Sequence, residues 1–261
     1  MRIIAVANQK GGVGKTTTTL NLGAALRECG RSVLLIDLDP QASLTASLGI
    51  KPDSLDLTIY DALSAAVKGE ERPGLREIIT EGDGLALAPA NIVLSKADRE
   101  LVLANLGVYA LRDALVSARD AYDYVLLDCP PSLGIMTDNA LAAADNVLIP
   151  MATDYLAWRG LALLLDSIAM MQKRTNRGLK IAGVVLTMAD SRLAHTREII
   201  EAVHANLGSQ VRVFETVIHM SVRLKEAPMT GHSILTYAKD STGARGYRDL
   251  ARELEAIWQS A

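Results

Sequence analysis

Cysteine is scarce in this chain of 261 residues, which contains only Cys29 and Cys129, far apart in the sequence. The two cysteines make no metal-ligand motif, and so low a cysteine content fits a reducing, cytoplasmic setting. Histidine is equally uninformative. His195, His204 and His232 have no metal-ligand spacing with acids or cysteines, and we interpret them as surface or core residues.

Long hydrophobic runs, linkers, repeats and an excess of positive charge are also lacking. No window approaches 18 uncharged apolar residues, so no membrane-spanning helix is predicted. Residues 1–4 lead directly into an apolar run, so we expect no signal peptide. The net charge of −3 argues against a globally basic nucleic-acid-binding protein but allows a local basic patch. With 49% hydrophobic residues, we predict one domain over residues 1–261.

Apolar runs of strand length recur along the chain, and most are followed by a segment with helical spacing. This alternation predicts an α/β fold, a mostly parallel twisted β-sheet with helices on both faces, which binds ligands at the carboxyl ends of its strands. The predicted strands span 3–7, 32–39, 85–89, 124–128, 146–150, 181–186 and 211–214, and the clearest predicted helices span 18–26, 58–63, 98–121 and 247–258.

A glycine-rich segment, NQKGGVGKTT at residues 8–17, lies between the first predicted strand and the first predicted helix. Backbone N–H groups bind phosphate in this setting, with Lys15 reaching the outer phosphates and the Thr16 hydroxyl binding Mg²⁺. The segment departs from G-x-x-x-x-G-K-[ST], because Gln9 replaces the first glycine and Lys10 adds a second cation. A chance lysine in an ordinary turn is disfavoured, because the flanks, the spacing and the Lys-Thr pair all agree.

Two predicted strands end in aspartates. Asp37 and Asp39 are two residues apart, which places them on the same face of a strand. Asp128 ends the strand 124–128. Because a buried carboxylate needs a partner, we predict that Asp128 holds Mg²⁺ through its water and that Asp39 positions the attacking water. The alternative, that Asp37 or Asp39 merely caps the following loop, stays open.

Three motifs together resemble those of the ParA family, the deviant Walker ATPases that partition plasmids, chromosomes and other cargo. They are KGGVGKTT at 10–17, DLDPQ at 37–41 and LDCPPS at 127–132. The resemblance continues through TMADSR at 187–192, VRLKEAP at 222–228 and GARGY at 243–247, and so covers nearly the whole chain. It implies a single-domain P-loop NTPase fold of the deviant Walker A type.

The resemblance also implies ATP and Mg²⁺ as cofactors and a homodimer that sandwiches two nucleotides. Lys10 matches the signature lysine that reaches the partner's ATP, Lys15 and Thr16 match the phosphate lysine and Mg²⁺ ligand, and Asp39 matches the aspartate needed for hydrolysis. The implied catalytic residues are thus Lys10, Lys15 and Asp39, and the residues at the metal are Thr16, Asp39 and Asp128. The implied nucleotide-binding residues are Lys10, Gly11, Gly12, Val13, Gly14, Lys15, Thr16, Thr17, Asp128, Thr187 and Met188.

The implied function is a weak, partner-stimulated ATPase that binds non-specific double-stranded DNA with ATP and releases it on hydrolysis. A ParB-like or other cargo adaptor would stimulate it, in the cytoplasm and associated with the nucleoid, without stable membrane association. We expect no N-terminal DNA-reading domain, because the chain begins at its first strand. Residues 219–252 contain six Lys or Arg against three acids. The implied DNA-binding residues are Arg192, Arg223, Lys225 and Arg245, with Arg197 nearby.

The sequence departs from the family pattern at two places. The sequence has His219-Met220-Ser221 where the family usually has Pro-Arg-Asn, which bears on adenine and DNA contacts. Asp154 stands where glutamate is common.

Alternative interpretations remain. The basic residues could be no more than a solvated surface. A MinD-like membrane-cycling ATPase would end in a basic amphipathic helix, but the polar side of 247–258 mixes Arg with Glu, so we predict a helix docked on the sheet. A nitrogenase iron protein or metal-cluster carrier of the same superfamily would need paired cysteines.

The apolar residues 161–165 are predicted to be core, and helix 98–121 could line a dimer face.

Overall fold

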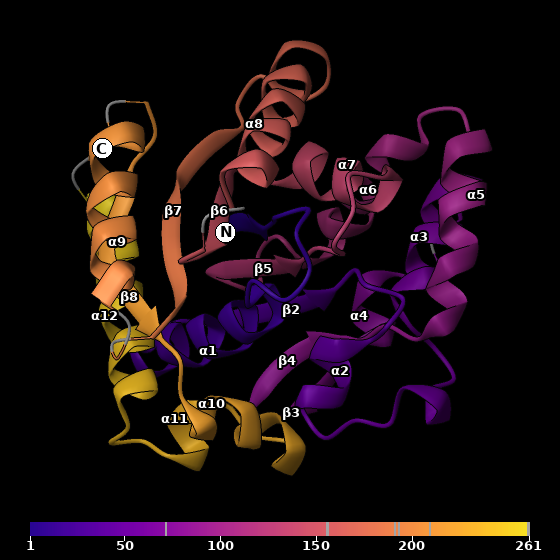
Figure 1. The fold of residues 1–261 in the computed structure, drawn as a ribbon. Helices are drawn as coiled ribbons and strands as arrows, with labels where there is room; N and C mark the ends of the chain where they lie inside the picture. Colours follow the sequence, from indigo (N-terminus) through magenta and orange to yellow (C-terminus); the bar gives the residue numbers. More distant parts are fainter. Residues whose placement is uncertain (71, 155–156, 191, 193, 209, 260–261) are drawn as a thin grey trace.

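The computed structural model describes residues 1–70, 72–154, 157–190, 192, 194–208 and 210–259, without the side chains of 157–159, 194, 195 and 259. Its centre is an eight-stranded sheet in the order β3-β4-β2-β5-β1-β6-β7-β8, in which only β3 runs antiparallel to its neighbour (Figure 1). The strands are β1 Arg2–Val6, β2 Val33–Asp37, β3 Thr80–Gly82, β4 Leu85–Ala88, β5 Tyr124–Asp128, β6 Asn146–Ala152, β7 Lys180–Ala189 and β8 Val213–His219.

Helices cover both faces of this sheet, because the central strands are apolar on both sides and must be shielded from water. The helices are α1 Lys15–Glu28, α2 Ser43–Ser47, α3 Ile59–Lys68, α4 Leu75–Ile78, α5 Ala97–Leu103, α6 Ala110–Ala114, α7 Ile135–Ala143, α8 Ala157–Arg174, α9 Ala194–Leu207, α10 Val222–Glu226, α11 Ile234–Tyr237 and α12 Thr242–Gln259. Short 3-10 turns span Pro52–Ser54, Ile92–Lys96, Gly107–Tyr109, Leu115–Ala118 and Ala227–Thr230.

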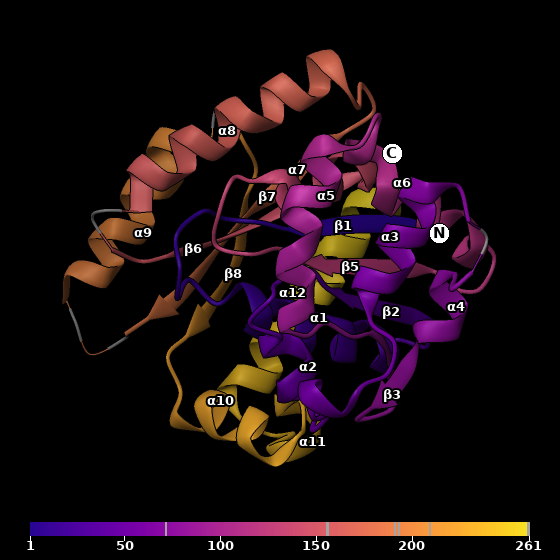
Figure 2. The same cartoon turned by 90° about the vertical axis from the view of Figure 1, so that its right-hand side faces the viewer.

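The two faces carry separate hydrophobic cores. One core joins the sheet to α1, α11 and α12, and the other joins it to α3 through α9. Figure 2 shows α3 and α5 in front of the sheet and α12 behind it. Because α12 belongs to the first core, with Leu250 and Leu254 fully buried, the structure confirms a final helix docked on the sheet. Of the apolar run 161–165, Leu161 and Leu164 are buried as predicted, whereas Leu163 is exposed.

The predicted α/β class and the predicted strand 124–128 are confirmed, and several boundaries are wrong. The predicted helix 98–121 is broken: α5 ends at Leu103, and Leu106 adopts a left-handed φ of 64°. At the next residue, a Cβ on Gly107 would lie 2.0 Å from the Leu101 carbonyl oxygen, so the chain turns where only glycine fits. The short strand β3 escaped prediction because its sequence, TEG, has little strand propensity.

Candidate nucleotide site and basic groove

The glycine-rich loop joins β1 to α1 at the carboxyl edge of the sheet. Gly12 and Gly14 have left-handed φ values of 74° and 83°, which glycine adopts without strain. No side chain caps α1 at Gly14, so the first N–H groups of the helix remain available to an anion. A cavity of about 360 Å³ opens here, lined by Gly11, Gly12, Gly14, Lys15, Thr16, Thr17, Asp39, Ser43, Ser47, Pro131 and Met188. The geometry is that of a phosphate-binding site.

The Lys15 side chain folds back across this loop. Its ammonium donates a hydrogen bond to the Lys10 carbonyl oxygen at 3.0 Å, and only 7% of the residue is exposed. Burial lowers the pKa of Lys15, and the nearby carboxylates of Asp128 and Asp39 oppose that shift. A buried ammonium that points into a loop of backbone amides is positioned to neutralise a phosphate.

Lys10 points away from the loop, toward the segment that follows β6. Its ammonium lies 2.6 Å from a carboxylate oxygen of Asp154. The backbone N–H of Lys10 donates to the Asn8 side chain at 3.0 Å, and the Asn8 amide donates to the Pro150 carbonyl at 2.8 Å. These bonds orient the second lysine of the loop within its own chain.

Asp128 accepts hydrogen bonds from two hydroxyls of α1, from Thr16 at 2.7 Å and from Thr19 at 3.3 Å. Burial, and next the neighbouring Asp37, raise the pKa of Asp128, because two carboxylates lie together out of water. The Thr16 hydroxyl donates a hydrogen bond to Asp128, which leaves the lone pairs of the hydroxyl oxygen for a cation. Oxygen donors beside buried negative charge suit Mg²⁺.

Asp37 is fully buried and has a local structural role. Its carboxylate accepts bonds from the Thr45 N–H at 2.9 Å, from the Thr45 hydroxyl at 2.8 Å and from the Asp39 N–H at 3.1 Å. The alternative that Asp37 caps the following loop is therefore confirmed. Burial raises its pKa despite these bonds.

Asp39 lies outside the strand, because β2 ends at Asp37, so the prediction that both share one strand face is wrong. One carboxylate oxygen of Asp39 accepts the Gln41 N–H at 2.9 Å. The residue also lines the phosphate cavity together with Lys15 and Thr16. It is thus the half-buried carboxylate that faces the phosphate position.

A second, small cavity of about 50 Å³ adjoins the loop on the side of β7 and β8. It is lined by Gly14, Thr17, Thr187, Met188, Ile218, His219, Met220, Ser221, Leu224, Lys225 and Tyr247. The Thr187 hydroxyl donates to the Val13 carbonyl at 2.8 Å, which ties the end of β7 to the loop. This cavity lies beside the first turn of α1, which makes it the candidate site for the nucleotide base. Residues 219–221 form part of its lining.

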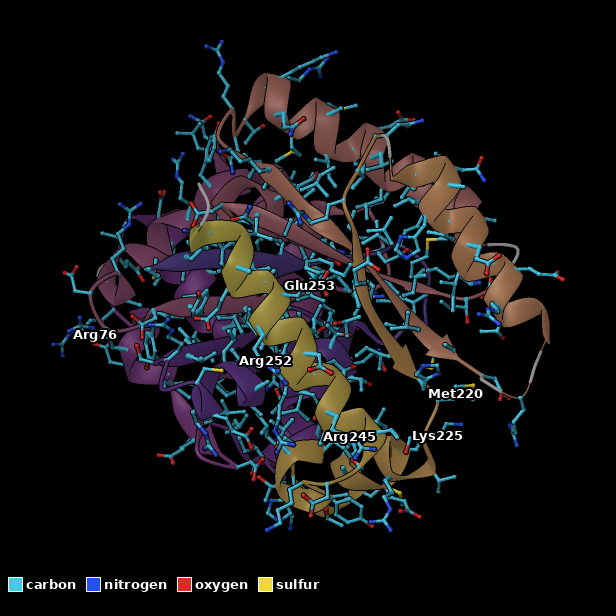
Figure 3. All side chains as sticks on the ribbon, turned by 90° about the vertical axis from the view of Figure 1, so that its left-hand side faces the viewer. Arg76, Met220, Lys225, Arg245, Arg252 and Glu253 are labelled. Atoms are coloured by element: carbon cyan, nitrogen blue, oxygen red, sulfur yellow. The ribbon has the colours of Figure 1, made fainter. Side chains whose placement is uncertain are left out.

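A larger open groove of about 810 Å³ lies between α10, α11 and the start of α12. Its lining is Ser221, Val222, Arg223, Thr236, Tyr237, Ala238, Lys239, Asp240, Ser241, Thr242 and Arg245. Figure 3 shows Arg245 and Lys225 on this side of the molecule, with Arg252 farther along α12.

The basic charge of this groove comes from fewer residues than the sequence count indicates. Arg248 is paired with Glu28 at 2.6 Å, and Arg252 with Asp249 at 2.7 Å. Within the part of the chain that the structure describes, the other four cations have no ion pair and are exposed. Arg223, Lys239 and Arg245 line the groove, whereas Lys225 lines the small cavity beside the loop. Lys239 lines the groove and belongs to the six cations of residues 219–252, but it was not in the predicted DNA-binding set.

Two further predicted DNA contacts are placed elsewhere. Both guanidinium contacts of Arg192 go to Asp190, at 2.9 and 2.7 Å, and Arg192 does not line the groove. Arg197 lies 3.5 Å from Glu201 on α9. The structure therefore does not bring either arginine together with Arg223 and Arg245 in the groove lining.

Comparison with known proteins finds many chains that are similar to this one over most of its length. Residues 1–181 match the family model described as an AAA domain. The chain is 43% identical to the sporulation initiation inhibitor protein Soj of Bacillus subtilis, over 98% of both chains. It is 44% identical to the chromosome partitioning protein ParA of Myxococcus xanthus, over 97% of this chain and 87% of that protein.

Solved structures repeat the whole fold. A protein of Mycobacterium smegmatis, described as cobyrinic acid a,c-diamide synthase with bound ADP and magnesium, is 38% identical and superposes with a TM-score of 0.86, over 100% of this chain and 96% of that chain. The cell division ATPase MinD of Pyrococcus furiosus is 26% identical, with a TM-score of 0.72 over 98% and 99% of the two chains.

Proposed function

This chain belongs to the ParA family of P-loop ATPases, and we propose that it positions DNA or another cargo by a cycle of ATP binding, dimerisation and hydrolysis. The observation that carries the proposal is the uncapped N-terminus of α1, which opens on a cavity lined by Lys15, Thr16 and Asp39. It combines an anion-binding helix end with a phosphate lysine, a Mg²⁺ ligand and a carboxylate for water.

We assign ATP and Mg²⁺ to this cavity. The Gly11–Thr17 backbone binds the phosphates, Lys15 neutralises the outer ones, and Thr16 holds the ion with Asp128 behind it. When bound, Mg²⁺ draws charge from the phosphate oxygens in the transition state. Asp39 accepts a hydrogen bond from the attacking water and orients it toward the phosphate. The base lies toward Thr187 and Met188.

Lys10 supplies the reason for a dimer. Lys15 already provides one ammonium for the phosphates of the nucleotide bound to its own subunit, whereas the Lys10 side chain points outward to Asp154. In the proposed ATP state two chains face each other, and each Lys10 turns to the nucleotide of the partner subunit. Hydrolysis removes the phosphate that is neutralised by Lys15 of one subunit and by the partner's Lys10, and the dimer then separates.

Non-specific DNA is proposed to bind at the groove formed by α10, α11 and α12. Its three unpaired cations, Arg223, Lys239 and Arg245, would contact backbone phosphates, which carry no sequence information. Because these contacts release counterions, we expect affinity to fall steeply with salt. A ParB-like or other adaptor would stimulate hydrolysis, and the protein would associate with the nucleoid in the cytoplasm.

The membrane-cycling alternative has less support in this structure. The apolar residues of α12 pack into the core, so this helix would have to detach from the sheet before it could bind lipid. As a separate finding, no described helix is long and apolar enough to cross a membrane.

Co-sedimentation separates the two functions. The protein is incubated with random-sequence DNA or with anionic liposomes, each with ATP–Mg²⁺ and with ADP–Mg²⁺. Retention on DNA that requires ATP is the expected result. Retention on liposomes alone would replace the DNA proposal with the membrane one.

A further inference from the structure

One wall of the basic groove is bonded directly to the helix of the phosphate loop. The wall is α11, whose residues Thr236 and Tyr237 line the groove. The N–H of Ile234, the first residue of α11, donates to the Asn21 side-chain oxygen at 2.7 Å. The Asn21 amide group donates in turn to the Thr17 carbonyl at 2.7 Å. One side chain therefore joins the first turn of α1 to the groove.

The bridging side chain and the α11 end of this connection are buried, whereas Thr17 is half-buried. Asn21 is 2% exposed and Ile234 is fully buried. A buried amide that loses a hydrogen-bond partner incurs most of its desolvation penalty. Both hydrogen bonds of Asn21 should therefore be retained when Thr17 or Ile234 shifts. A movement of the first turn of α1 is then transmitted to α11 instead of being absorbed between them.

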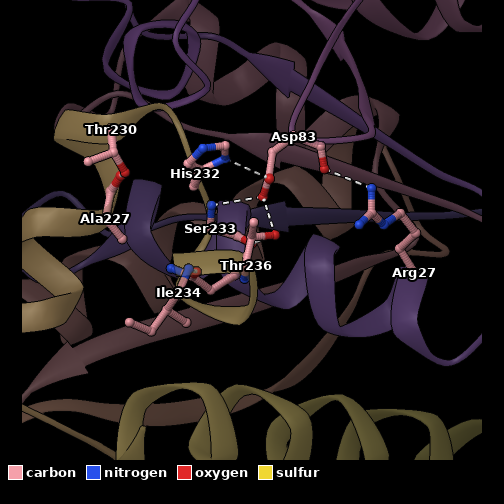
Figure 4. A network of polar contacts seen from close by, with 9 residues as sticks. Arg27, Asp83, Ala227, Thr230, His232, Ser233, Ile234 and Thr236 are labelled. Carbon is pink, nitrogen blue, oxygen red and sulfur yellow. Dashed lines mark hydrogen bonds and ion pairs between the residues drawn. The ribbon is translucent and has the colours of Figure 1, made fainter. Parts of the chain in front are cut away.

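The other side of α11 is anchored at the far edge of the sheet, in the turn between β3 and β4 (Figure 4). Asp83 in this turn accepts bonds from the Ser233 N–H at 2.9 Å and the Thr236 hydroxyl at 3.1 Å, and contacts His232 Nδ1 at 3.0 Å. Arg27 holds the Asp83 carbonyl at 2.7 Å. The α11 segment is thus fixed at one side by Asp83 and connected to the phosphate loop at the other by Asn21.

We propose that Asn21 is a positioning residue that couples phosphate binding at the loop to the conformation of the groove wall. Anion binding draws the N–H groups of the first turn of α1 toward the ligand, and Thr17, which lines the phosphate cavity, moves with them. Asn21 passes this shift to Ile234. The inference rests on the proposed function only where the groove is taken as the DNA site.

Hydrogen exchange of the full-length protein tests the coupling without DNA. Exchange of the backbone amides of residues 233–238 is measured with and without ATP–Mg²⁺ in the wild type, Asn21→Ala and Asn139→Ala. Asn139 is a matched control, since it is also fully buried and bonds three backbone groups, but on the opposite face of the sheet. ATP binding is measured in parallel with a fluorescent analogue.

We expect ATP to change the exchange rates of residues 233–238 by about fivefold or more in the wild type and in Asn139→Ala, the range of ordinary allosteric coupling. In Asn21→Ala the change should fall below about twofold while ATP still binds. If Asn21→Ala does not fold, Asn21→Asp replaces it, because Asp keeps the acceptor for Ile234 and loses the donor to Thr17.

Two results would overturn the inference: an ATP effect that persists in the Asn21 variant, or no ATP effect in the wild type. DNA retention by the same samples tests the proposed function separately. A wild type that never binds DNA would refute the DNA proposal, while the exchange data would still decide the role of Asn21.

Discussion

The ammonium of Lys10 and the carboxylate of Asp154 lie 2.6 Å apart within one chain. If Lys10 serves the nucleotide of the partner subunit, this pair must open first. The two side chains are 35% and 44% exposed, so the pair contributes only about 0–1 kcal/mol. The contact would therefore restrain the dimer weakly and would not block it.

Removing this restraint should favour the dimer. We expect Asp154→Asn to tighten ATP-dependent dimerisation by about two- to fivefold, the range of an exposed ion pair. Asp190→Asn, which breaks the exposed pair with Arg192, is the control and should leave dimerisation unchanged. Light scattering with ATP and with ADP measures both.

Lys10→Ala should separate nucleotide binding from dimerisation. Lys15 and the loop backbone remain in place, so ATP affinity should be largely retained, whereas the ATP-dependent dimer should be lost. The check is analytical ultracentrifugation with ATP–Mg²⁺. An unchanged dimer in this variant would refute the trans role of Lys10.

Asp39→Ala should stop hydrolysis without preventing ATP binding. Asp39 is not part of the loop that holds the phosphates, so ATP should still bind. Its carboxylate lines the phosphate cavity and is assigned to the attacking water, so its loss should lower the turnover rate by about 10²-fold or more. The variant should stay dimeric and bound to DNA in ATP. Normal phosphate release by this variant would remove Asp39 from the mechanism.

Two arginines of α12, Arg245 and Arg252, should contribute differently to DNA binding. Arg245→Ala should weaken DNA binding and lower the slope of log affinity against log salt by about one, as expected for one lost phosphate contact. Arg252→Ala, whose guanidinium is paired with Asp249, should change neither quantity. Fluorescence anisotropy over a salt series compares them, and equal losses would place the DNA elsewhere.

The buried carboxylate of Asp128 predicts a pH dependence of stability. Its folded-state pKa is raised above the ordinary value of 3.8, so the folded state holds the proton more tightly than the unfolded state. Stability contributed by the protonated group is therefore present at low pH and is lost as the pH rises above 3.8 through the folded-state value. ATP–Mg²⁺ should restore it.

Thermal unfolding tests this prediction with Asp128→Asn, which cannot ionise. Without ligand at neutral pH, the variant should have a higher Tm than the wild type. With ATP–Mg²⁺ its gain in Tm should be smaller than that of the wild type. A wild-type Tm gain that is independent of pH would contradict the electrostatic account.

Much of the site was predictable because it depends on local order along the chain. The loop 8–17 follows a buried strand and opens a helix, so its phosphate-binding geometry follows from adjacent residues. The helix break at Gly107 was missed, since it depends on the close approach to Leu101. The position of Asp39 beyond β2 was missed as well, since it depends on where the pairing of β2 with β5 ends.

By itself, the sequence determined the α/β class, the phosphate loop and the carboxylates that face it, because periodicity and motif spacing are properties of neighbouring residues. Only the tertiary structure decided which charges remain unpaired in the groove, that Lys10 meets Asp154, and that Asn21 bridges α1 to α11. These relationships join residues up to 220 positions apart, and they depend on side-chain directions in the packed fold.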